Sequence, residues 1–140
     1  MITARVPHRI SLLGGGTDLI AYSKLHGGHV VSMAINKYVY VSVKKHGEFF
    51  NERIRLNYSQ TETVNEIDEI KKKIIKACLS FLNVKDPLYI STISDLPSGS
   101  GLGSSSAFTV GLLQCLHQYL GQSTVPLQLA EEASFIEIDS

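Results

Sequence analysis

Cysteine is rare in this sequence: its 140 residues include two, Cys78 and Cys115. Neither belongs to a C-x-x-C pair, and two isolated cysteines make no disulfide framework. Each lies in an apolar segment with helical spacing. We therefore expect two small core residues in a protein of a reducing compartment.

Net charge and long apolar runs are also missing. Basic and acidic side chains both number 13, so the formal net charge is zero, which argues against nucleic acid as the main partner. No apolar stretch approaches the ~20 residues that span a bilayer, and the N-terminus lacks the basic and apolar regions of a signal peptide. The composition, 44% hydrophobic and 19% charged, is ordinary for one globular domain. We expect a cytoplasmic protein that binds neither nucleic acid nor membranes.

The first half of the chain is patterned for strands and the second for helices. Period-two alternation and flanking turn residues predict strands at residues 2–6, 9–13, 29–35, 37–44, 52–57 and 88–93. We expect Pro7 to break the first pair and Asn36 the second. Helical spacing predicts a helical turn at residues 22–25 and helices at 64–82, 104–120 and 126–139.

One local excess of positive charge stands out, at Lys71-Lys72-Lys73 and Lys76. These lysines fall on the expected helix 64–82. We interpret them as the solvated face of that helix, with a binding patch as the less favoured alternative.

The most informative segment is the glycine- and serine-rich run at residues 97–107, directly ahead of the apolar helix at 104–120. Glycine lets the backbone adopt positive φ and approach an anion closely. The first amides of a helix are unpaired, and its dipole favours negative charge. Serine hydroxyls add donors for phosphate oxygens. The run predicts a nucleotide-phosphate loop, and its alternative is a turn that only caps a core helix.

Common phosphate-binding patterns do not explain this segment. A Walker A loop needs a lysine, and none follows Asp86. Gly99, Gly101 and Gly103 are spaced i, i+2, i+4, which differs from the G-x-G-x-x-G of dinucleotide folds. The G-x-S-x-G elbow of hydrolases is absent as well.

A second glycine run, Gly14-Gly15-Gly16, is followed by Thr17 and Asp18. The glycines permit a tight loop open to a ligand, and a hydroxyl with a carboxylate suits the hydroxyls of a sugar or polyol. Upstream, Arg9 keeps its charge and suits a developing phosphoryl charge. The alternative for Asp18 is the cap of a short helix.

These two segments together resemble the N-terminal half of the GHMP kinases, the superfamily of galactokinase, homoserine kinase and mevalonate kinase. The superfamily motif P-x-x-x-G-L-[GS]-S-S-[AS]-[AS] is matched from Pro97 to Ala107. The resemblance runs from residue 4 to about residue 139. It implies an α+β fold, also found in a small-subunit ribosomal protein, with a β-rich first half followed by helices packed on the sheet.

The resemblance also assigns roles. It makes residues 1–140 the N-terminal ATP-binding domain, with ATP and Mg²⁺ as cofactors. The implied ATP-binding residues are Pro97, Gly99, Ser100, Gly101, Leu102, Gly103, Ser104, Ser105 and Ser106. Ser105 and Glu137 would hold the metal, with Glu131 and Glu132 as competing carboxylates on solvated positions. Arg9 would be catalytic, and Gly15, Gly16, Thr17 and Asp18 would bind the substrate.

The glycine run narrows the implied substrate. Galactokinases carry G-R-V-N-L-I-G-E-H-T-D, whereas this chain has Gly15-Gly16 in place of the Glu-His pair. Its R-I-S-x-x-G-G-G-T-D form is similar to the D-glycero-D-manno-heptose 7-phosphate kinases, and fucokinase-type proteins begin similarly. The resemblance implies a sugar or sugar-phosphate kinase, with a galactokinase or fucokinase type and a non-catalytic ATP or sugar sensor as alternatives. A mevalonate- or homoserine-type kinase is disfavoured by Thr17-Asp18.

The D-Q motif that carries the catalytic aspartate of heptose and galactose kinases is absent from this sequence. We therefore expect the 140 residues to be a fragment without the C-terminal domain, which by itself binds weakly and turns over poorly.

Overall fold

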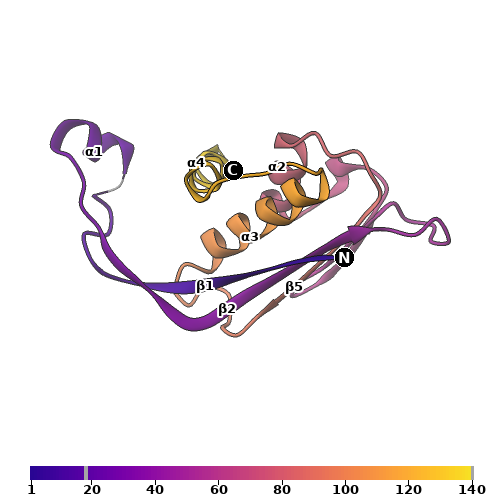
Figure 1. Ribbon diagram of the computed structural model, residues 1–140, viewed down its shortest axis with the longest axis horizontal. Coiled ribbons are helices and arrows are strands. Elements are labelled where there is room, and N and C mark those ends of the chain that lie inside the picture. The colour runs from indigo at the N-terminus through magenta and orange to yellow at the C-terminus, as the bar shows by residue number, and fades with distance from the viewer. Residues whose placement is uncertain (18, 140) are drawn as a thin grey trace.

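The structure is a computed structural model that describes residues 1–17 and 19–139. A five-stranded sheet has the order β1-β2-β5-β3-β4, antiparallel except where β3 lies parallel to β5. Its strands are β1 (Ile2–Leu13), β2 (Val31–Lys45), β3 (Ile54–Asn57), β4 (Thr61–Val64) and β5 (Leu88–Ser94). Helices α2 (Lys73–Phe81), α3 (Ser104–Tyr119) and α4 (Pro126–Asp139) lie on one side of the sheet (Figure 1). The expected α+β architecture is confirmed.

The core forms where α3 packs on β1 and β2. The predicted alternation of β2 is confirmed, because Val39, Val41 and Val43 are all buried on one face. Helix α3 approaches the sheet at Gly111, where an added Cβ would lie 3.1 Å from methyl carbons of Val6 and Val41. A side chain there would hold the helix off the sheet.

Pro7 does not break the first strand, contrary to our expectation. β1 runs through it to Leu13, with a register irregularity between Pro7 and Arg9. The strand lies at the edge of the sheet, where a missing backbone N–H leaves no inner neighbour unpaired. The break expected at Asn36 is also wrong, since β2 is continuous there.

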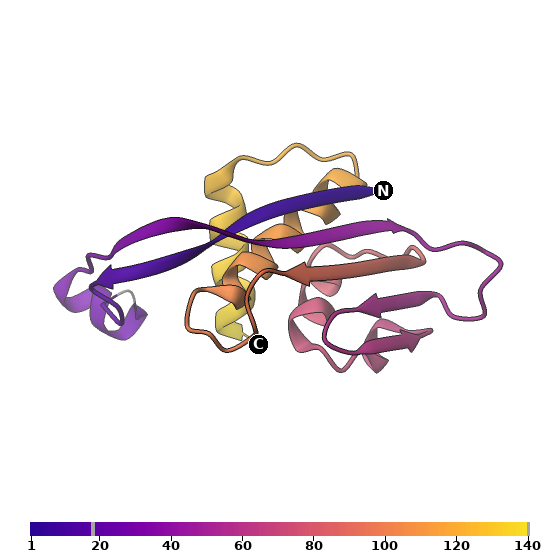
Figure 2. The same cartoon turned by 90° about the horizontal axis from the view of Figure 1, so that it is seen from below.

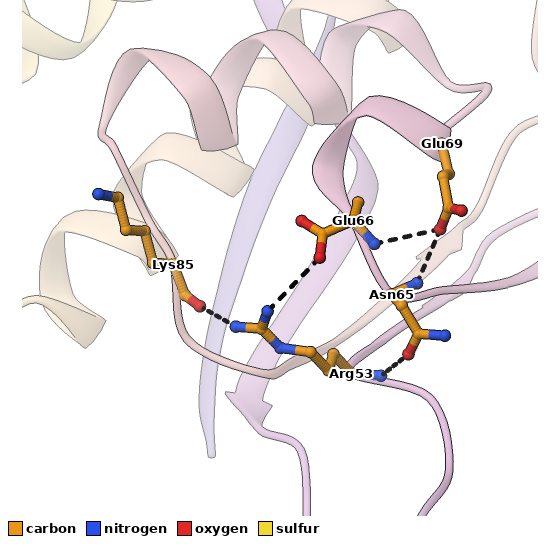
Figure 3. Close-up of polar contacts among 5 residues, drawn as sticks. All are labelled: Arg53, Asn65, Glu66, Glu69 and Lys85. Atoms are coloured by element: carbon orange, nitrogen blue, oxygen red, sulfur yellow. Dashed lines mark hydrogen bonds and ion pairs between the residues drawn. The ribbon is translucent and has the colours of Figure 1, made fainter.

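The helix predicted at residues 64–82 is wrong in its first half. Strand β4, the 3₁₀ turn η1 (Ile67–Glu69) and an extended segment precede α2. Glu69 accepts hydrogen bonds from the backbone N–H groups of Asn65 (2.9 Å) and Glu66 (3.1 Å), and Asn65 accepts one from the N–H of Arg53 (Figure 3). The Arg53 guanidinium also donates to the carbonyl of Lys85 (2.8 Å). The N–H of Lys71, which a continuous helix would bond to the carbonyl of Ile67, donates instead to the Glu62 carboxylate (2.9 Å).

The far halves of β1 and β2 extend beyond the other strands as a two-stranded ribbon. β5 pairs with residues 39–45 of β2, and the ribbon carries α1 (Ile20–His26) past the end of the sheet (Figure 2). We call residues 12–33 the arm, and the sheet with α2, α3 and α4 the body. The arm exposes the large apolar side chains of Leu12, Leu13, Leu19, Tyr22, Leu25, Val30, Val31 and Met33.

Both cysteines are fully buried and free, which confirms them as core residues. Burial raises the pKa of the Cys78 thiol to about 12 and that of the Cys115 thiol to about 11. They are therefore unreactive thiols at neutral pH. Within the described residues, no helix has the length and apolarity to cross a membrane.

Candidate nucleotide and phosphate site

The glycine-serine run forms most of the loop between β5 and α3 and the first turn of α3, and all three of its glycines adopt left-handed backbone angles. Gly99, Gly101 and Gly103 have φ values of 80°, 73° and 73°. Gly103 is the N-cap of α3. A Cβ on Gly99 or Gly101 would meet no atom within 4 Å, so this side of the loop is open to a ligand.

Arg9 lies against the end of this loop. Its backbone N–H donates to the carbonyl of Leu102 (3.1 Å). Its guanidinium covers Gly103 so closely that a Cβ on that glycine would overlap it. The predicted catalytic arginine is thus held at the N-terminus of α3. Its guanidinium charge and the positive end of the helix dipole there both favour an anion.

A pocket of about 550 Å³ opens beside the loop. Tyr58, Lys72, Ser94, Ser105 and Phe108 contribute to its wall, together with residues at the start of the loop. Pockets of this size, with aromatic surface and a few polar groups, commonly hold small-molecule ligands.

A second pocket, of about 540 Å³, brings together Ser105, Glu137 and the lysine run 71–73. Glu137 reaches it from α4, where its carboxylate accepts a hydrogen bond from Ser106 Oγ (3.1 Å). Thr109 Oγ1 lies 3.1 Å from the other carboxylate oxygen and 3.0 Å from the carbonyl of Ser105. The predicted metal pair, Ser105 and Glu137, therefore lines one cavity, although the two residues come from different helices, α3 and α4. The roles assigned to these residues stay predictions.

The competing carboxylates point elsewhere. Glu131 is exposed, as expected. Glu132 is not a solvated residue, which corrects our interpretation: its carboxylate lies 2.7 Å from the buried His117 ring and accepts a hydrogen bond from Gln128 at 2.8 Å. Glu132 thus joins α4 to α3, and its two carboxylate oxygens contact His117 and Gln128.

The lysine run is held in place by a buried carboxylate. Glu62 accepts hydrogen bonds from the Tyr58 hydroxyl and from the backbone N–H of Lys71 (2.9 Å). Burial alone would raise the pKa of Glu62, but these bonds hold it below its ordinary value. The same bond from Tyr58 to Glu62 raises the pKa of that phenol to about 12.

This anchoring changes the interpretation of the lysines. The Lys72 ammonium lies 5.6 Å from the centroid of the Tyr58 ring, and Lys71 and Lys72 precede α2 rather than lying along it. They are exposed, as expected, but they line the two pockets instead of forming an outer helix face. The alternative of a binding patch gains support.

The second glycine run lies at the tip of the arm. The Thr17 hydroxyl lies 2.7 Å from the carbonyl of Gly14 and 3.1 Å from that of His29, and it accepts the N–H of His29. These hydrogen bonds close the loop, so Thr17 braces it. Gly15 and Gly16 have open space above them. Asp18 lies outside the described residues, and the substrate-binding role of all four residues stays a prediction.

Sequence reasoning missed several residues of this region, among them His8, Tyr58, Glu62 and Thr109. Thr109 lies four residues after Ser105, which on a helix places both on one face, so that spacing was an available signal. Tyr58 and Glu62 come together because β3 and β4 form a hairpin, and no periodic pattern marks their contact.

Comparison with known proteins identifies the family of this chain. The family model described as the GHMP kinases N terminal domain matches residues 68–140, and this chain belongs to that family. A D-glycero-alpha-D-manno-heptose 7-phosphate kinase of Campylobacter jejuni is 32% identical over 97% of this chain and 43% of its own length. A galactokinase of Thermotoga maritima is 28% identical over 96% of this chain and 38% of its length.

Solved structures show the same fold. A D-glycero-D-manno-heptose 1-phosphate kinase of Bacteroides thetaiotaomicron superposes with a TM-score of 0.84 at 25% identity, covering 98% of this chain and 48% of that one. The chain thus spans less than half the length of the relatives named here.

Proposed function

We propose that this chain is the nucleotide-binding part of an ATP-dependent sugar kinase, which transfers the γ-phosphoryl group to a hydroxyl of a sugar or sugar phosphate. The observation that carries the proposal is the convergence at the N-terminus of α3. An open loop with positive-φ glycines, the Arg9 guanidinium and the lysine run 71–73 all lie around it. Together they offer unpaired amides and positive charge to a polyphosphate.

The residues also suit Mg²⁺. A carboxylate and a hydroxyl, Glu137 and Ser105, line one cavity, and Mg²⁺ takes hard oxygen ligands while keeping several waters. Among the described residues, no group of three or more His, Cys, Asp or Glu side chains could hold a metal by itself. The remaining ligands would therefore be phosphate and water oxygens. A bound Mg²⁺ would neutralise charge on the phosphate oxygens.

The pocket beside the loop suits the nucleoside. It starts at the same loop and continues past Ser105 toward Tyr58 and Phe108, which supply aromatic surface for a planar base. Lys72 borders both pockets, so its ammonium would lie between the nucleoside and the phosphates.

Transfer of a phosphoryl group needs positioning and charge neutralisation more than covalent chemistry. Arg9 is placed to neutralise charge, because its backbone bond to Leu102 and its packing on Gly103 hold the guanidinium at the end of the phosphate loop. Its permanent charge would stabilise a phosphoryl group in transfer.

For the acceptor we propose D-glycero-D-manno-heptose 7-phosphate. Support comes from the Campylobacter jejuni relative and from the Gly15-Gly16 pair, which stands where galactokinases carry Glu-His and has open space above it. Galactose is the second candidate, because the Thermotoga maritima galactokinase matches nearly as much of the chain.

Nucleotide binding is tested by thermal unfolding with Mg²⁺ and the non-hydrolysable analogue AMP-PNP. A ligand that binds only the folded state raises Tm by mass action. Ser105→Ala should lower the affinity for AMP-PNP about tenfold or more, with little change in the Tm of the ligand-free protein. Ser134→Ala, an exposed serine on α4, is the matched control. A wild-type protein whose Tm does not respond to any Mg-nucleotide would refute the proposal.

The acceptor is tested with labelled ATP and a panel of D-glycero-D-manno-heptose 7-phosphate, galactose and fucose. We expect phosphorylation of the heptose phosphate with the highest kcat/KM. A preference for galactose would replace the heptose assignment with a galactokinase and leave the nucleotide proposal intact.

A further inference from the structure

His8 is a fully buried polar residue directly under the phosphate loop. It falls at the register irregularity of β1, between Pro7 and Arg9, so its backbone has no partner in the β1–β2 register. Figures 1 and 2 both draw the β5–α3 loop beside this part of β1, and the bond from Arg9 N–H to the Leu102 carbonyl (3.1 Å) joins them. A buried imidazole needs partners for its two nitrogens.

Those partners are the two ends of the loop. His8 Nε2 lies 3.2 Å from Ser94 Oγ, where β5 ends. His8 Nδ1 lies 3.5 Å from Ser104 Oγ, the first residue of α3. One ring therefore bridges the entry and the exit of the segment that carries the phosphate-binding glycines.

The hydrogen bonds of Ser94 fix which nitrogen carries the proton. The Ser94 hydroxyl donates its single hydrogen to the carbonyl of Leu96 (2.8 Å) and accepts from the N–H of Leu96 (3.2 Å). It has no second hydrogen for the ring, so Nε2 must be the donor in that contact. In a neutral imidazole Nδ1 is then an acceptor.

This tautomer sets the direction of the Ser104 hydroxyl. Its hydrogen points back to His8 Nδ1, and its lone pairs face Ser100, whose Oγ lies 3.4 Å away. Phosphate oxygens accept hydrogen bonds, and the hydrogen of Ser104 is already used by His8. Ser104 therefore braces the loop, and the backbone amides and the neighbouring serines are the groups that can donate to a phosphate.

We propose that His8 is a positioning residue for nucleotide binding: its imidazole joins Ser94 to Ser104 and so presets the shape of the phosphate loop. The inference rests on the proposed nucleotide function. A loop that is already ordered loses less conformational entropy when it binds, and that saving appears as affinity. Arg9, the next residue, adds its backbone bond to Leu102, so two adjacent residues of β1 hold the loop at three points.

A double-mutant cycle tests this coupling, with Mg²⁺ and AMP-PNP as the probe. His8→Phe keeps an aromatic ring but removes both nitrogens, and Ser104→Ala removes the partner hydroxyl. Each single substitution should lower the affinity for AMP-PNP about tenfold. The double variant should lose little more affinity than either single variant, because both substitutions break the same hydrogen-bond network. The KM for the sugar should stay within about twofold of wild type.

His46→Phe is the matched control. His46 is also buried, but it lies at the other end of the β2–β5 pair, where Lys45 pairs with Leu88. It should leave nucleotide affinity unchanged. A His8→Phe protein with wild-type affinity, or losses from His8→Phe and Ser104→Ala that simply multiply, would overturn the inference.

A second measurement needs no nucleotide. Without His8 the Leu96 amide should exchange about tenfold faster with solvent, because its acceptor Ser94 is no longer fixed by the ring. Nitrogen NMR of the wild-type ring should show the hydrogen on Nε2. If the wild-type protein binds no nucleotide, the proposed function fails, and unchanged exchange at Leu96 would separately overturn the role of His8.

If His8→Phe does not fold, Ser94→Ala serves in its place. Ser94 is exposed, so its loss spares the core while removing the Nε2 partner. Ser94→Ala should lower the affinity for AMP-PNP about as much as Ser104→Ala does. Wild-type affinity in both variants would again refute the inference.

Discussion

Leucines in the body and in the arm have opposite environments. Leu112 and Leu116 on α3 are 0% exposed, whereas Leu13 and Leu25 in the arm are 71% and 79% exposed. The residue type is the same, so hydrophobicity alone does not decide the position. The body has two layers, a sheet and its helices, that cover each other. The arm is a ribbon of two strands with one short helix, which is too thin to cover its own apolar faces.

The two glycine loops differ in the same way. The loop at residues 95–103 is hydrogen-bonded to β1 and continues into α3, a helix of 16 residues with a largely buried face. The loop at residues 14–17 is closed by contacts of Thr17, through its hydroxyl and through its backbone N–H, which donates to the carbonyl of Gly14 (3.1 Å). A change in the first loop should therefore reach the core, and a change in the second should remain local.

The largest expected effect tests burial itself. Leu116→Ala should lower the free energy of unfolding by about 3 kcal/mol, since it opens a cavity between α3 and the sheet. Leu25→Ala in the arm should change it by less than about 0.5 kcal/mol. Urea unfolding of both variants measures the difference. Equal losses would mean that the arm is covered in solution.

The next effect compares two glycines with positive φ. Gly103→Ala should cost about 2 kcal/mol, because it combines a left-handed backbone at φ 73° with displacement of the Arg9 guanidinium. Gly16→Ala, at φ 91° with open space above it, should cost about 1 kcal/mol from the backbone alone. Urea unfolding measures both costs. AMP-PNP affinity should fall for Gly103→Ala and stay near wild type for Gly16→Ala.

The smallest expected effect is the pH dependence of stability, which distinguishes the body from the arm. The arm contains one carboxylate in its sequence, Asp18, so the titration of carboxylates below about pH 5 reports mainly on the body. Tyr58→Phe should cost about 1 kcal/mol, because Glu62 stays buried with one donor fewer. Tyr119→Phe, whose hydroxyl donates to exposed Asp86, is the matched control and should cost less than about 0.5 kcal/mol.

The sign of the pH dependence follows from the two shifts. The pKa of Glu62 is lowered in the fold, so its contribution is present above the ordinary carboxyl range and is lost as pH falls through the folded pKa. The pKa of Tyr58 is raised to about 12, so its contribution is present below its ordinary pKa of about 10 and is lost as pH rises through 12. Between about pH 5 and 9 the cost of Tyr58→Phe should be flat. A cost that grows on acidification would contradict this assignment.

The sequence predicted well wherever one element carries the whole pattern. Alternating valines gave the buried face of β2, and the apolar circumference of α3 gave a buried helix. It failed where a distant partner intervenes. The first half of the helix expected at residues 64–82 was wrong because Asn65 bonds to Arg53 and the N–H of Lys71 bonds to Glu62, and the β3–β4 hairpin brings these groups together.

The sequence by itself predicted a glycine-rich loop that leads into a buried helix, because glycine spacing, serines and the following helix are all local properties of residues 97–120. The choice of Glu137 as a metal ligand came from the family resemblance and stays a prediction. Only the tertiary structure decided that Glu137 meets Ser106, that the lysine run lines the same cavity as Ser105, and that His8 joins both ends of the loop. Such contacts unite segments tens of residues apart, and they form only when helices and strands pack against one another.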